Sequence, residues 1–599
     1  MSLAVGSMNN YGGSVMDELD APVLYYHDET MPPIEPGTFG FGLSRRSFLA
    51  GGASALMATI LAGCGGKSSD SGGATTTLPG GPVTTANAIP VAGDASSTST
   101  TGAARTEAKT ETITVGVSSL QEAYVDPNWA VGGLIFPLQW AIADFLYFPD
   151  KDGKFQPTLA TGYTLSDDKL KWTFKLRPNV KMHDGSTFGA KDVKTTIDRI
   201  VSGPNAKDYA HYVAVKGAII AANVIDDLTV EIVTSKPFAT CVVDMPPPIA
   251  SDYYNQVGEV EFKKNPKSTG PWKFVSQELN ANVKYDRHEE FWDASRKPNW
   301  KKLVYAIVPD ESARVAGIKT GTLDLAYGLT GSGAEGLKGD ANVKVVEIKE
   351  TGLGYCMMLD NVFPNEPSPL QDVRVRRALL MAVDREAIAK ALYKGYATVP
   401  QSGTPKITPG FNPDNKAVPF DPEGAKKLLA EAGVTNLEIQ LGSYTTTTVP
   451  DMPKLAETIA QYWQQVGVKA TLNNMETATY LPSWRNKQLK GAGMIAGPTY
   501  FYVEPSRLSV NSFFGSTAVY STIVGNAELD AVIEKITVET DFDKRAALGR
   551  QQADLIDKNL WGLPMILTSS LIAVGPNVQT FGYIVSCPYA GPTTMIVAK

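Results

Sequence analysis

The sequence predicts an α/β fold with more than one domain, and three observations support this. Segments with apolar residues at helical spacing alternate with short segments in which apolar and polar residues alternate one by one. The chain has 599 residues, too many for a single hydrophobic core, so two or three domains are expected. Hydrophobic residues make up 43% and charged residues 20% of the chain, which is ordinary for a protein that folds in water.

The composition also excludes several classes of protein. The formal net charge is −7, so nucleic acid is not an expected partner. No apolar run reaches the roughly 18–20 residues that a membrane span needs. Four cysteines are too few for a disulfide scaffold, and four histidines leave little for a histidine-built metal site. We therefore expect no cofactor and no metal.

The first 63 residues have the layout of an export signal. Arg45 and Arg46 precede an apolar run over residues 50–63 and resemble a twin-arginine signal. The sequence Leu61-Ala62-Gly63-Cys64 resembles the lipobox of bacterial lipoproteins, in which Cys64 would become the lipidated first residue. The alternatives are a short buried helix over the same run and, because a long acidic segment precedes Arg45, a later start such as Met31.

Residues 64–111 are predicted to be the lipidated cysteine and a flexible tether. They are mostly Gly, Ser, Thr, Ala and Pro, and such a stretch cannot bury enough apolar surface to fold. The root-mean-square reach of such a tether is about 35–40 Å. A lipid at one end and a folded body at the other indicate a protein that is held at a membrane and works in water.

The folded body begins with clear strand patterns. Apolar and polar residues alternate over 112–117, 170–176 and 229–233. Between the last two segments, Gly189 is a candidate N-cap, with Asp192 in the first turn of a helix that continues through residues 197 and 200.

The second half of the body has stronger helix signals. A cap, a proline and an early acid at 421–423 open a helix that Gly433 ends. A further helix is expected from Lys454 to Val466, with a strand over 468–472 directly after it. Asp372 caps a helix over 373–382, and Asp384 opens another that ends near residue 395.

Several blocks of this body resemble the family 5 extracellular solute-binding proteins, the peptide- and nickel-type receptors of ABC importers. The resemblance covers about residues 112–599. The matching blocks, in chain order, are Leu159-Ala160-Thr161-Gly162-Tyr163, Trp172 to Arg177, Val180 to Gly185, Ser268-Thr269-Gly270-Pro271-Trp272, Val373 to Glu386, and Asp421 to Gly433.

The resemblance implies a two-lobed periplasmic-binding-protein-like fold of type II that traps a ligand between its lobes. Lobe 1 would take 112–354 plus 566–599, with an extra subdomain at 131–267, and lobe 2 would take 355–565. The hinge crossovers would lie near 355–361 and 563–567. The implied protein is a monomeric, lipid-anchored subunit, periplasmic or at the cell surface, which delivers a small solute such as a peptide, saccharide or conjugate to an ABC permease.

Three groups of residues that suggest chemistry have simpler structural interpretations. The tripeptide His183-Asp184-Gly185 places a histidine beside a carboxylate, but it also fits a tight turn, which we prefer. The arginines at 374, 376 and 377 are predicted to form a solvated face with one structural ion pair. The cysteines at 241, 356 and 587 are predicted to be buried thiols.

Enzyme motifs are absent or incomplete. The string Gly331 to Gly336 matches a dinucleotide fingerprint, but Gly339 and an expected strand near Val343 leave no room for the helix that the motif requires. The sequence has no Walker-type loop, no HExxH and no GxSxG. The members of a Ser/His/Asp triad are far apart in a sequence, so no local pattern identifies one. We therefore predict no catalysis, with a secreted α/β hydrolase or a receptor for a sensor system as the alternatives.

The segment that would meet the ligand departs from the family pattern. Peptide-binding relatives carry a Trp-x-x-Asp-Tyr-x-Asp-Pro motif, whose first Asp holds the ligand's amino terminus. Aligning that motif on Glu504-Pro505 places Phe501 where that Asp stands. The segment 443–448, where dipeptide receptors place an Arg for the ligand carboxylate, carries no charge. A buried ammonium without a carboxylate costs several kcal/mol, so we expect an uncharged, partly apolar ligand.

Aromatic side chains are the expected walls of the site. For the three consecutive aromatic residues in this set, ordinary packing under a loop is the alternative. The candidates are Tyr124, Trp129, Tyr355, Tyr444, Trp484, Tyr500, Phe501 and Tyr502.

Overall fold

We analysed a computed structural model of the chain. It describes residues 106–119, 124–129, 136–150, 155–206, 209, 212–359, 367–445, 449–486, 488–498, 504, 526–583 and 596–599. The contacts divide the chain into residues 1–44 and 45–599, and every described residue belongs to the second unit. The predicted export signal and most of the predicted tether lie outside the described residues.

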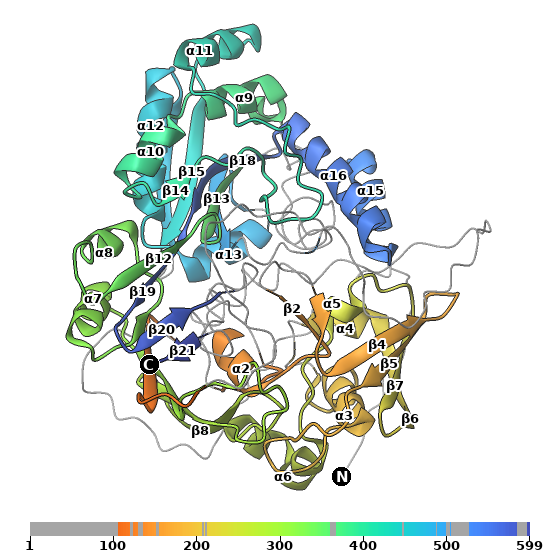
Figure 1. Ribbon diagram of the computed structural model, residues 1–599. Coiled ribbons are helices and arrows are strands. Elements are labelled where there is room, and N and C mark those ends of the chain that lie inside the picture. The colour runs from red at the N-terminus through yellow and green to blue at the C-terminus, as the bar shows by residue number, and fades with distance from the viewer. Residues whose placement is uncertain are drawn as a thin grey trace, which may run out of the picture. The chain divides into compact units, whose positions relative to one another are not determined.

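The largest sheet has seven strands and joins segments that are far apart in the sequence (Figure 1). Its order is β12 (Lys344–Ile348), β19 (Ser570–Val574), β11 (Leu325–Ala326), β1 (Thr112–Val117), β10 (Lys302–Ile307), β9 (Asn282–Arg287) and β8 (Trp272–Glu278). The first strand, β1, pairs in parallel with β10 and β11. Strand β19 returns from near the C-terminus and pairs antiparallel with β11 and β12. Its helices are α2 (Phe136–Ile142), α7 (Glu311–Thr320) and α8 (Gly331–Glu335).

A second, antiparallel sheet has four strands and its own core of buried side chains. Its order is β4 (Ala160–Leu165), β5 (Lys171–Leu176), β7 (Thr229–Thr234) and β6 (Ile219–Asp226). The helices of this segment are α3 (Ala190–Val201), α4 (Val213–Ala218), α5 (Cys241–Asp244) and α6 (Ser251–Lys264). Two short ribbons, β2 (Tyr147–Pro149) with β3 (Phe155–Pro157) and β20 (Val578–Phe581) with β21 (Ile596–Ala598), complete this half of the fold.

The third sheet has six strands and a separate, larger core. Its order is β14 (Ala397–Thr398), β18 (Gly562–Thr568), β13 (Leu353–Leu359), β17 (Ala492–Pro498), β15 (Glu438–Thr445) and β16 (Lys469–Glu476). The helices of this segment are η3 (Pro369–Gln371), α9 (Val373–Met381), α10 (Arg385–Ala391), α11 (Pro422–Glu431), α12 (Met452–Gln465), α13 (Thr477–Arg485), α15 (Ala527–Val538) and α16 (Phe542–Asn559). Helices α15 and α16 lie side by side in Figure 1.

The chain changes between the seven-stranded and the six-stranded sheet at two neighbouring places. The first change falls between Ile348 and Leu353, and the second falls at Ser569 between β18 and β19. The two segments are tied together, because the amide of Gly352 donates to the carbonyl of Thr568 at 2.9 Å and the amide of Leu353 donates to the Thr568 hydroxyl at 2.7 Å.

Most of the elements predicted from the sequence are present. Gly189 is the N-cap of α3, and its amide donates to the Asp192 carboxylate at 2.9 Å. Asp421 caps α11 by accepting from the amide of Gly424 at 2.8 Å. Helix α12 begins at Met452, two residues before the predicted Lys454.

The predicted turn and thiols are present where the structure describes them. Gly185 has a φ of 90°, and the Asp184 carboxylate accepts from the amide of Ser186 at 3.0 Å, so the tripeptide is a turn. Cys241 is buried and Cys356 is half-buried, and both are free thiols. Burial raises the pKa of both thiols, that of Cys356 to about 12. Cys587 lies outside the described residues.

One prediction about these motifs holds and another was wrong. The string Gly331 to Gly336 itself forms the short helix α8, which the Thr330 hydroxyl caps, and β12 begins at Lys344, so no dinucleotide-binding helix opens after the string, as expected. Arg376 was expected on a solvated face, but it is buried and donates to the backbone carbonyls of Leu370, Gln371 and Asn559. Only Arg374 forms the expected exposed ion pair, with Asp372 at 2.6 Å.

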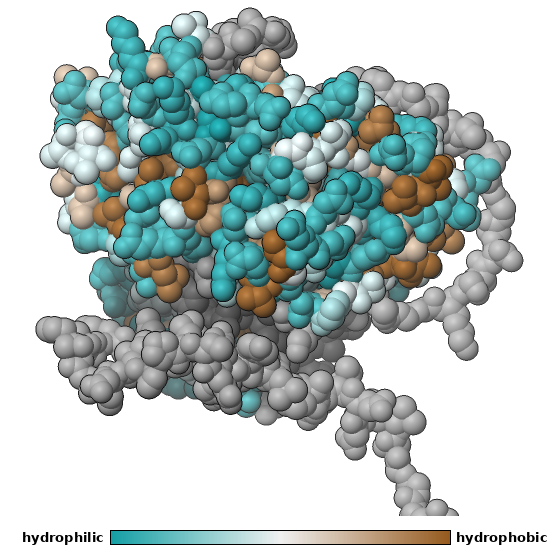
Figure 2. Space-filling model, turned by 90° about the horizontal axis from the view of Figure 1, so that it is seen from below, coloured by the Kyte–Doolittle hydropathy of each residue, from teal (hydrophilic) through white to brown (hydrophobic). Residues whose placement is uncertain are grey.

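The described surface is predominantly polar. Figure 2 shows hydrophilic side chains over most of the coloured face, with apolar residues in small separate groups. Within the described ranges, no helix is both long enough and apolar enough to cross a membrane.

Candidate functional site

The structure describes five of the eight predicted wall residues: Tyr124, Trp129, Tyr355, Tyr444 and Trp484. The other three predicted wall residues, at 500–502, lie outside the described residues, as do Arg45, Arg46 and Cys64.

Three of the five wall candidates belong to one aromatic group on the six-stranded sheet. Tyr355 lies on β13, Tyr444 on β15 and Trp484 on α13. The rings of Tyr444 and Tyr480 are 4.9 Å apart, and Trp484 packs edge-on to Tyr480 at 5.7 Å. Tyr444 is the second-last residue of β15. All three candidates are buried, with exposures of 3–5%, and they pack within the core of this sheet.

A carboxylate that the sequence analysis missed lies beside this group. Asp451 is the N-cap residue of α12, but its side chain makes no capping hydrogen bond. It is half-buried, and none of the described side chains or amides donates to its carboxylate within hydrogen-bond distance. Burial raises the pKa of Asp451, and the charge of Glu311 raises it further. In the sequence, Asp451 stands out only as a possible N-cap of the following helix. An N-cap carboxylate is occupied by backbone amides, so this signal argued against a role in ligand binding.

The neighbours of Asp451 come from different segments. The rings of Tyr355 and Tyr393 are 5.8 Å apart, and the pKa of each phenol is raised first by burial and also by the charge of Asp451. Glu311 comes from the start of α7, where it accepts from the Thr330 hydroxyl at 2.9 Å. The site around Asp451 thus combines residues from the segment that builds the six-stranded sheet with Glu311 of α7, from the segment that builds the seven-stranded sheet.

The other two wall candidates, Tyr124 and Trp129, lie together in a separate place. The Trp129 ring stands edge-on to Tyr124 at 6.3 Å and to Tyr209 at 5.9 Å. The Lys263 ammonium lies 4.0 Å from the centre of the Trp129 ring, within the range of a cation–π contact. The structure therefore groups the described wall residues into two sets.

A buried charge network fixes the segment that carries Trp129. Arg199 is buried and contacts Asp126 at 2.5 Å and Glu259 at 3.0 Å. The Asp126 carboxylate also accepts from the amide of Asn128 at 2.9 Å, which shapes the turn into Trp129. Burial alone would raise the pKa of Glu259, but its hydrogen bonds with Arg199 and the charge of that residue outweigh burial and lower the pKa to about 2.

The carboxylate that follows Phe501 in the ligand motif is already engaged. Glu504 is 1% exposed and forms a two-point ion pair with Arg545 of α16, at 2.6 and 3.0 Å. Arg545 also donates to the backbone carbonyl of Glu539 at 2.8 Å. Glu504 is thus a structural partner of α16 and does not replace the carboxylate that position 501 lacks.

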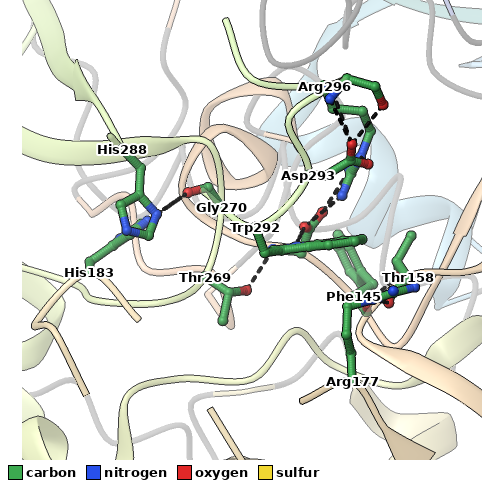
Figure 3. A network of polar contacts seen from close by, with 12 residues as sticks. Phe145, Thr158, Arg177, His183, Thr269, Gly270, His288, Trp292, Asp293 and Arg296 are labelled. Carbon is green, nitrogen blue, oxygen red and sulfur yellow. Dashed lines mark hydrogen bonds and ion pairs between the residues drawn. The ribbon is translucent and has the colours of Figure 1, made fainter. Parts of the chain in front are cut away.

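His183, from one family block, forms a buried neutral pair with His288 beside the carbonyl of Gly270, which belongs to a second block (Figure 3). The rings of His183 and His288 are 5.0 Å apart. The amide of Ser268 donates to Nδ1 of His183, so Nε2 of that ring donates to the Gly270 carbonyl at 2.9 Å. Nδ1 of His288 approaches the same carbonyl at 3.2 Å. Their role is structural, because both rings contact the backbone carbonyl of Gly270.

The same region contains a second network, and the amide of Asp144 connects it to the block 268–272 by donating to the Thr269 hydroxyl at 3.3 Å. Figure 3 shows Arg296 between Asp293 and the rings around Trp292. The Arg296 guanidinium binds Asp144 at 2.8 and 2.9 Å, and the Trp292 indole donates to Asp144 at 2.8 Å. Gly270 packs so closely on the end of α2 that a Cβ there would lie 2.3 Å from the Ala143 nitrogen. The family block therefore joins two segments of the first sheet.

The described residues offer no constellation for catalysis or for a metal. In the ranges that the structure describes, no three His, Cys, Asp or Glu side chains form a group that could hold a metal ion. The convergent groups are phenols, indoles and one open carboxylate, which suit recognition of a polar and partly apolar molecule.

Comparison with known proteins identifies the family. The profile described as bacterial extracellular solute-binding proteins, family 5 Middle, matches residues 154–517. The chain belongs to this family. Heme-binding protein A of Haemophilus influenzae is 28% identical over 462 residues, which cover 72% of this chain and 82% of that protein. A glutathione-binding protein of Salmonella typhimurium is 27% identical over 453 residues, which cover 73% of this chain and 85% of that protein.

The structure comparison agrees on the fold. The structure of HbpA2 from Haemophilus parasuis matches with a TM-score of 0.71 and 24% identity, covering 82% of this chain and all of that chain. The family 5 solute-binding protein is therefore a mixed α/β protein of the periplasmic-binding type, as the sequence predicted. It is a substrate-binding protein of a peptide/nickel-type ABC importer and not an enzyme, so the hydrolase alternative is excluded. The two curated relatives are named for different ligands, so membership leaves the solute open.

Proposed function

We propose that this solute-binding protein is lipid-anchored through Cys64 and delivers an uncharged, partly apolar solute to a membrane permease. The candidate classes are a saccharide, an opine-like conjugate, a blocked peptide or an aromatic metabolite. A pull-down of membrane partners tests delivery to a permease, and recovery of a sensor protein without a permease would contradict it.

The observation that carries the ligand class is the Glu504–Arg545 ion pair. Peptide-binding relatives share an Asp whose carboxylate holds the ligand's amino terminus. In this chain Phe501 aligns with that Asp. Glu504 is the nearest acidic residue in the motif, and its two oxygens are bound by Arg545. A free ammonium held at this position would remain without a partner, which costs several kcal/mol.

Asp451 supplies a second element of the proposed recognition. It is a half-buried carboxylate that caps nothing and that lies beside the phenols of Tyr355 and Tyr393. A carboxylate in this setting accepts strong hydrogen bonds from hydroxyl or amide donors. We assign it to the donors of the solute, away from the position that the family motif uses.

The two-lobe arrangement is also part of the proposal, with lobe 1 at 112–354 and 566–599, its subdomain at 131–267, and lobe 2 at 355–565. The sheet orders support two lobes, because β19 returns to the seven-stranded sheet and β13 to β18 form the six-stranded sheet. The chain changes sheet between Ile348 and Leu353 and at Ser569, a few residues from the predicted crossovers near 355–361 and 563–567, which overlap β13 and β18. A solute that contacts both lobes would favour the closed form.

Mass spectrometry of solute released from protein purified without refolding tests the ligand class. Calorimetry then compares the dipeptide Ala-Leu with N-acetyl-Ala-Leu-amide and with a panel of neutral saccharides. We expect binding of the blocked or neutral compounds. Micromolar binding of Ala-Leu that Phe501→Ala leaves unchanged would contradict the proposed pocket.

A further inference from the structure

Buried polar side chains without hydrogen-bond partners occur both on α16 and on the loop that follows β14. Gln552 is fully buried, and both its amide oxygen and its amide nitrogen lack a hydrogen-bond partner. Thr404 and Thr408 are each 2% exposed, and their hydroxyls also lack a partner. Four polar atoms with unmet hydrogen-bonding capacity therefore occur on two adjoining segments.

Two anchors place the loop along α16. At one end, the Asp557 carboxylate accepts from the Ser402 hydroxyl at 2.6 Å and from the amide of Gly403 at 2.9 Å. At the other end, Arg550 donates to the carbonyl of Phe411 at 2.8 Å. Gly410, with a φ of 96°, lies so close to the helix that a Cβ would be 2.4 Å from the Ala546 carbonyl oxygen.

The anchors bring the two threonines to the level of Gln552. Helix positions 550 and 557 are separated by about 10 Å along the axis, and Gln552 lies between them on the buried face. The loop folds compactly over the same span, because the amide of Thr408 donates to the carbonyl of Pro405 at 3.0 Å. Thr404 and Thr408 are thus held between the two anchors and against the helix.

The chemistry of these groups specifies the occupant. A carboxamide needs both a donor and an acceptor, and each hydroxyl can act as either. Asp557, a half-buried carboxylate on the same helix, already accepts from Ser402, Gly403 and Asn415, so its oxygens are engaged by the loop. A neutral molecule that both donates and accepts fits this set, and water is the smallest one.

We infer that Gln552, Thr404 and Thr408 enclose a site for buried water that joins the loop to α16. Buried polar groups in folded proteins are almost always hydrogen-bonded, and a buried water commonly makes about three hydrogen bonds to groups that lack other partners. The site belongs to the six-stranded-sheet half of the molecule, on the helix that also holds Glu504 through Arg545.

A crystal structure of the wild-type protein tests this directly. We expect ordered water within hydrogen-bond distance of at least three of the four atoms. A dry cavity, or Gln552 paired directly with a threonine, would overturn the inference, and neither result depends on a variant that folds poorly.

A pair of variants supplies a second test. If the Gln552 amide is hydrogen-bonded to water, Gln552→Met removes those hydrogen bonds and lowers the thermal unfolding midpoint by about 1–3 °C. If the amide is truly unpaired, the same change leaves the midpoint unchanged or raises it, which would count against the water site. Gln551→Met is the matched control, because Gln551 is the exposed neighbour on the same helix and its change should not shift the midpoint.

Discussion

At the scale of single residues, the decisive property is whether a polar side chain already has a partner. The Glu504 carboxylate is paired with Arg545 and is therefore not open to a ligand. The Asp451 carboxylate is half-buried and makes no capping hydrogen bond. His183 and His288 are both occupied by the carbonyl of Gly270. Residue types alone would have ranked Glu504 and His183 above Asp451 as functional groups.

Replacing Asp451 by Asn should weaken solute binding. The amide keeps the shape but loses the charge that strengthens hydrogen bonds to donors, so we expect a loss of about 10-fold in affinity. Calorimetry with the neutral panel compound that binds wild type most tightly gives the measurement. Asp414→Asn, on the exposed part of the loop after β14, is the control. Equal affinities for wild type and Asp451→Asn would remove Asp451 from the site.

The buried histidine pair should make stability depend on pH between about 6.5 and 4. Burial first, and the charge of Lys273 second, lower the pKa of His288 to about 4, and burial with the neighbouring His288 lowers that of His183. Below pH 6.5 these histidines are protonated in the unfolded chain but remain neutral in the folded chain. The free energy of unfolding therefore falls as the pH falls through this window. The contribution of His288 amounts to about 3 kcal/mol.

Unfolding in denaturant at pH 7.5 and at pH 4.5 measures this effect. The variant His288→Phe cannot take up the proton, so it should lose less stability than wild type between the two pH values. The carboxylates titrate equally in both proteins and cancel in the comparison. Identical losses in the two proteins would refute the assignment to His288.

At the scale of elements, side chains from one element fix the position of another. Arg199 of α3 holds the segment 126–129, and Arg545 of α16 holds Glu504. Both ion pairs are buried, so their contribution is chiefly to orientation, because the cost of removing charges from water offsets much of their attraction. Asp126 and Glu504 are close in sequence to two of the predicted wall residues, Trp129 and Phe501.

Breaking the Glu504–Arg545 pair from one side should be more harmful than removing both partners. Glu504→Gln leaves the Arg545 charge buried without its carboxylate, and we expect a loss of about 3–5 kcal/mol in the free energy of unfolding. The double variant Glu504→Met with Arg545→Met should recover a large part of that loss. A double-mutant cycle in chemical denaturation gives the coupling energy. A double variant less stable than Glu504→Gln would show that the pair stabilises more than it orients.

At the scale of the whole molecule, the two largest sheets are built by exchange of chain segments. The chain enters the six-stranded sheet after Ile348 and leaves it at Ser569, and Thr568 ties the two crossing segments together through Gly352 and Leu353. Two adjacent crossings form a natural hinge, which is the mechanical requirement of the proposed closure on a solute.

The proposed anchor is tested on the full chain in bacteria. Cys64→Ser should abolish labelling by a palmitate analogue and move the protein from the membrane fraction to the soluble fraction, because a diacylated cysteine is what retains it. Ser69→Ala in the same tether is the control and should keep both properties. Replacing Arg45 and Arg46 by Lys should separately block export. Labelling that survives Cys64→Ser would refute lipidation at this residue.

The sequence by itself determined the local elements and the family. Alternating patterns predicted β1, β5 and β7, and the caps at Gly189 and Asp421 predicted α3 and α11, because these signals depend on neighbours only a few residues away. The motif blocks predicted the fold class and the absence of catalysis, which the family match confirms. The departure at Phe501 was also visible from the sequence alone, and its meaning for the ligand stays a prediction.

Only the tertiary structure decided which polar groups remain open. Arg376 was predicted to be solvated, but it is buried and donates to the carbonyl of Asn559, 183 positions away, as well as to two nearby carbonyls. The pairing of Glu504 with Arg545, the open carboxylate of Asp451 and the unpaired polar atoms around Gln552 likewise depend on segments that meet only in the folded chain. Hydrogen-bond satisfaction is a property of packing between distant segments, so no local pattern in the sequence encodes it.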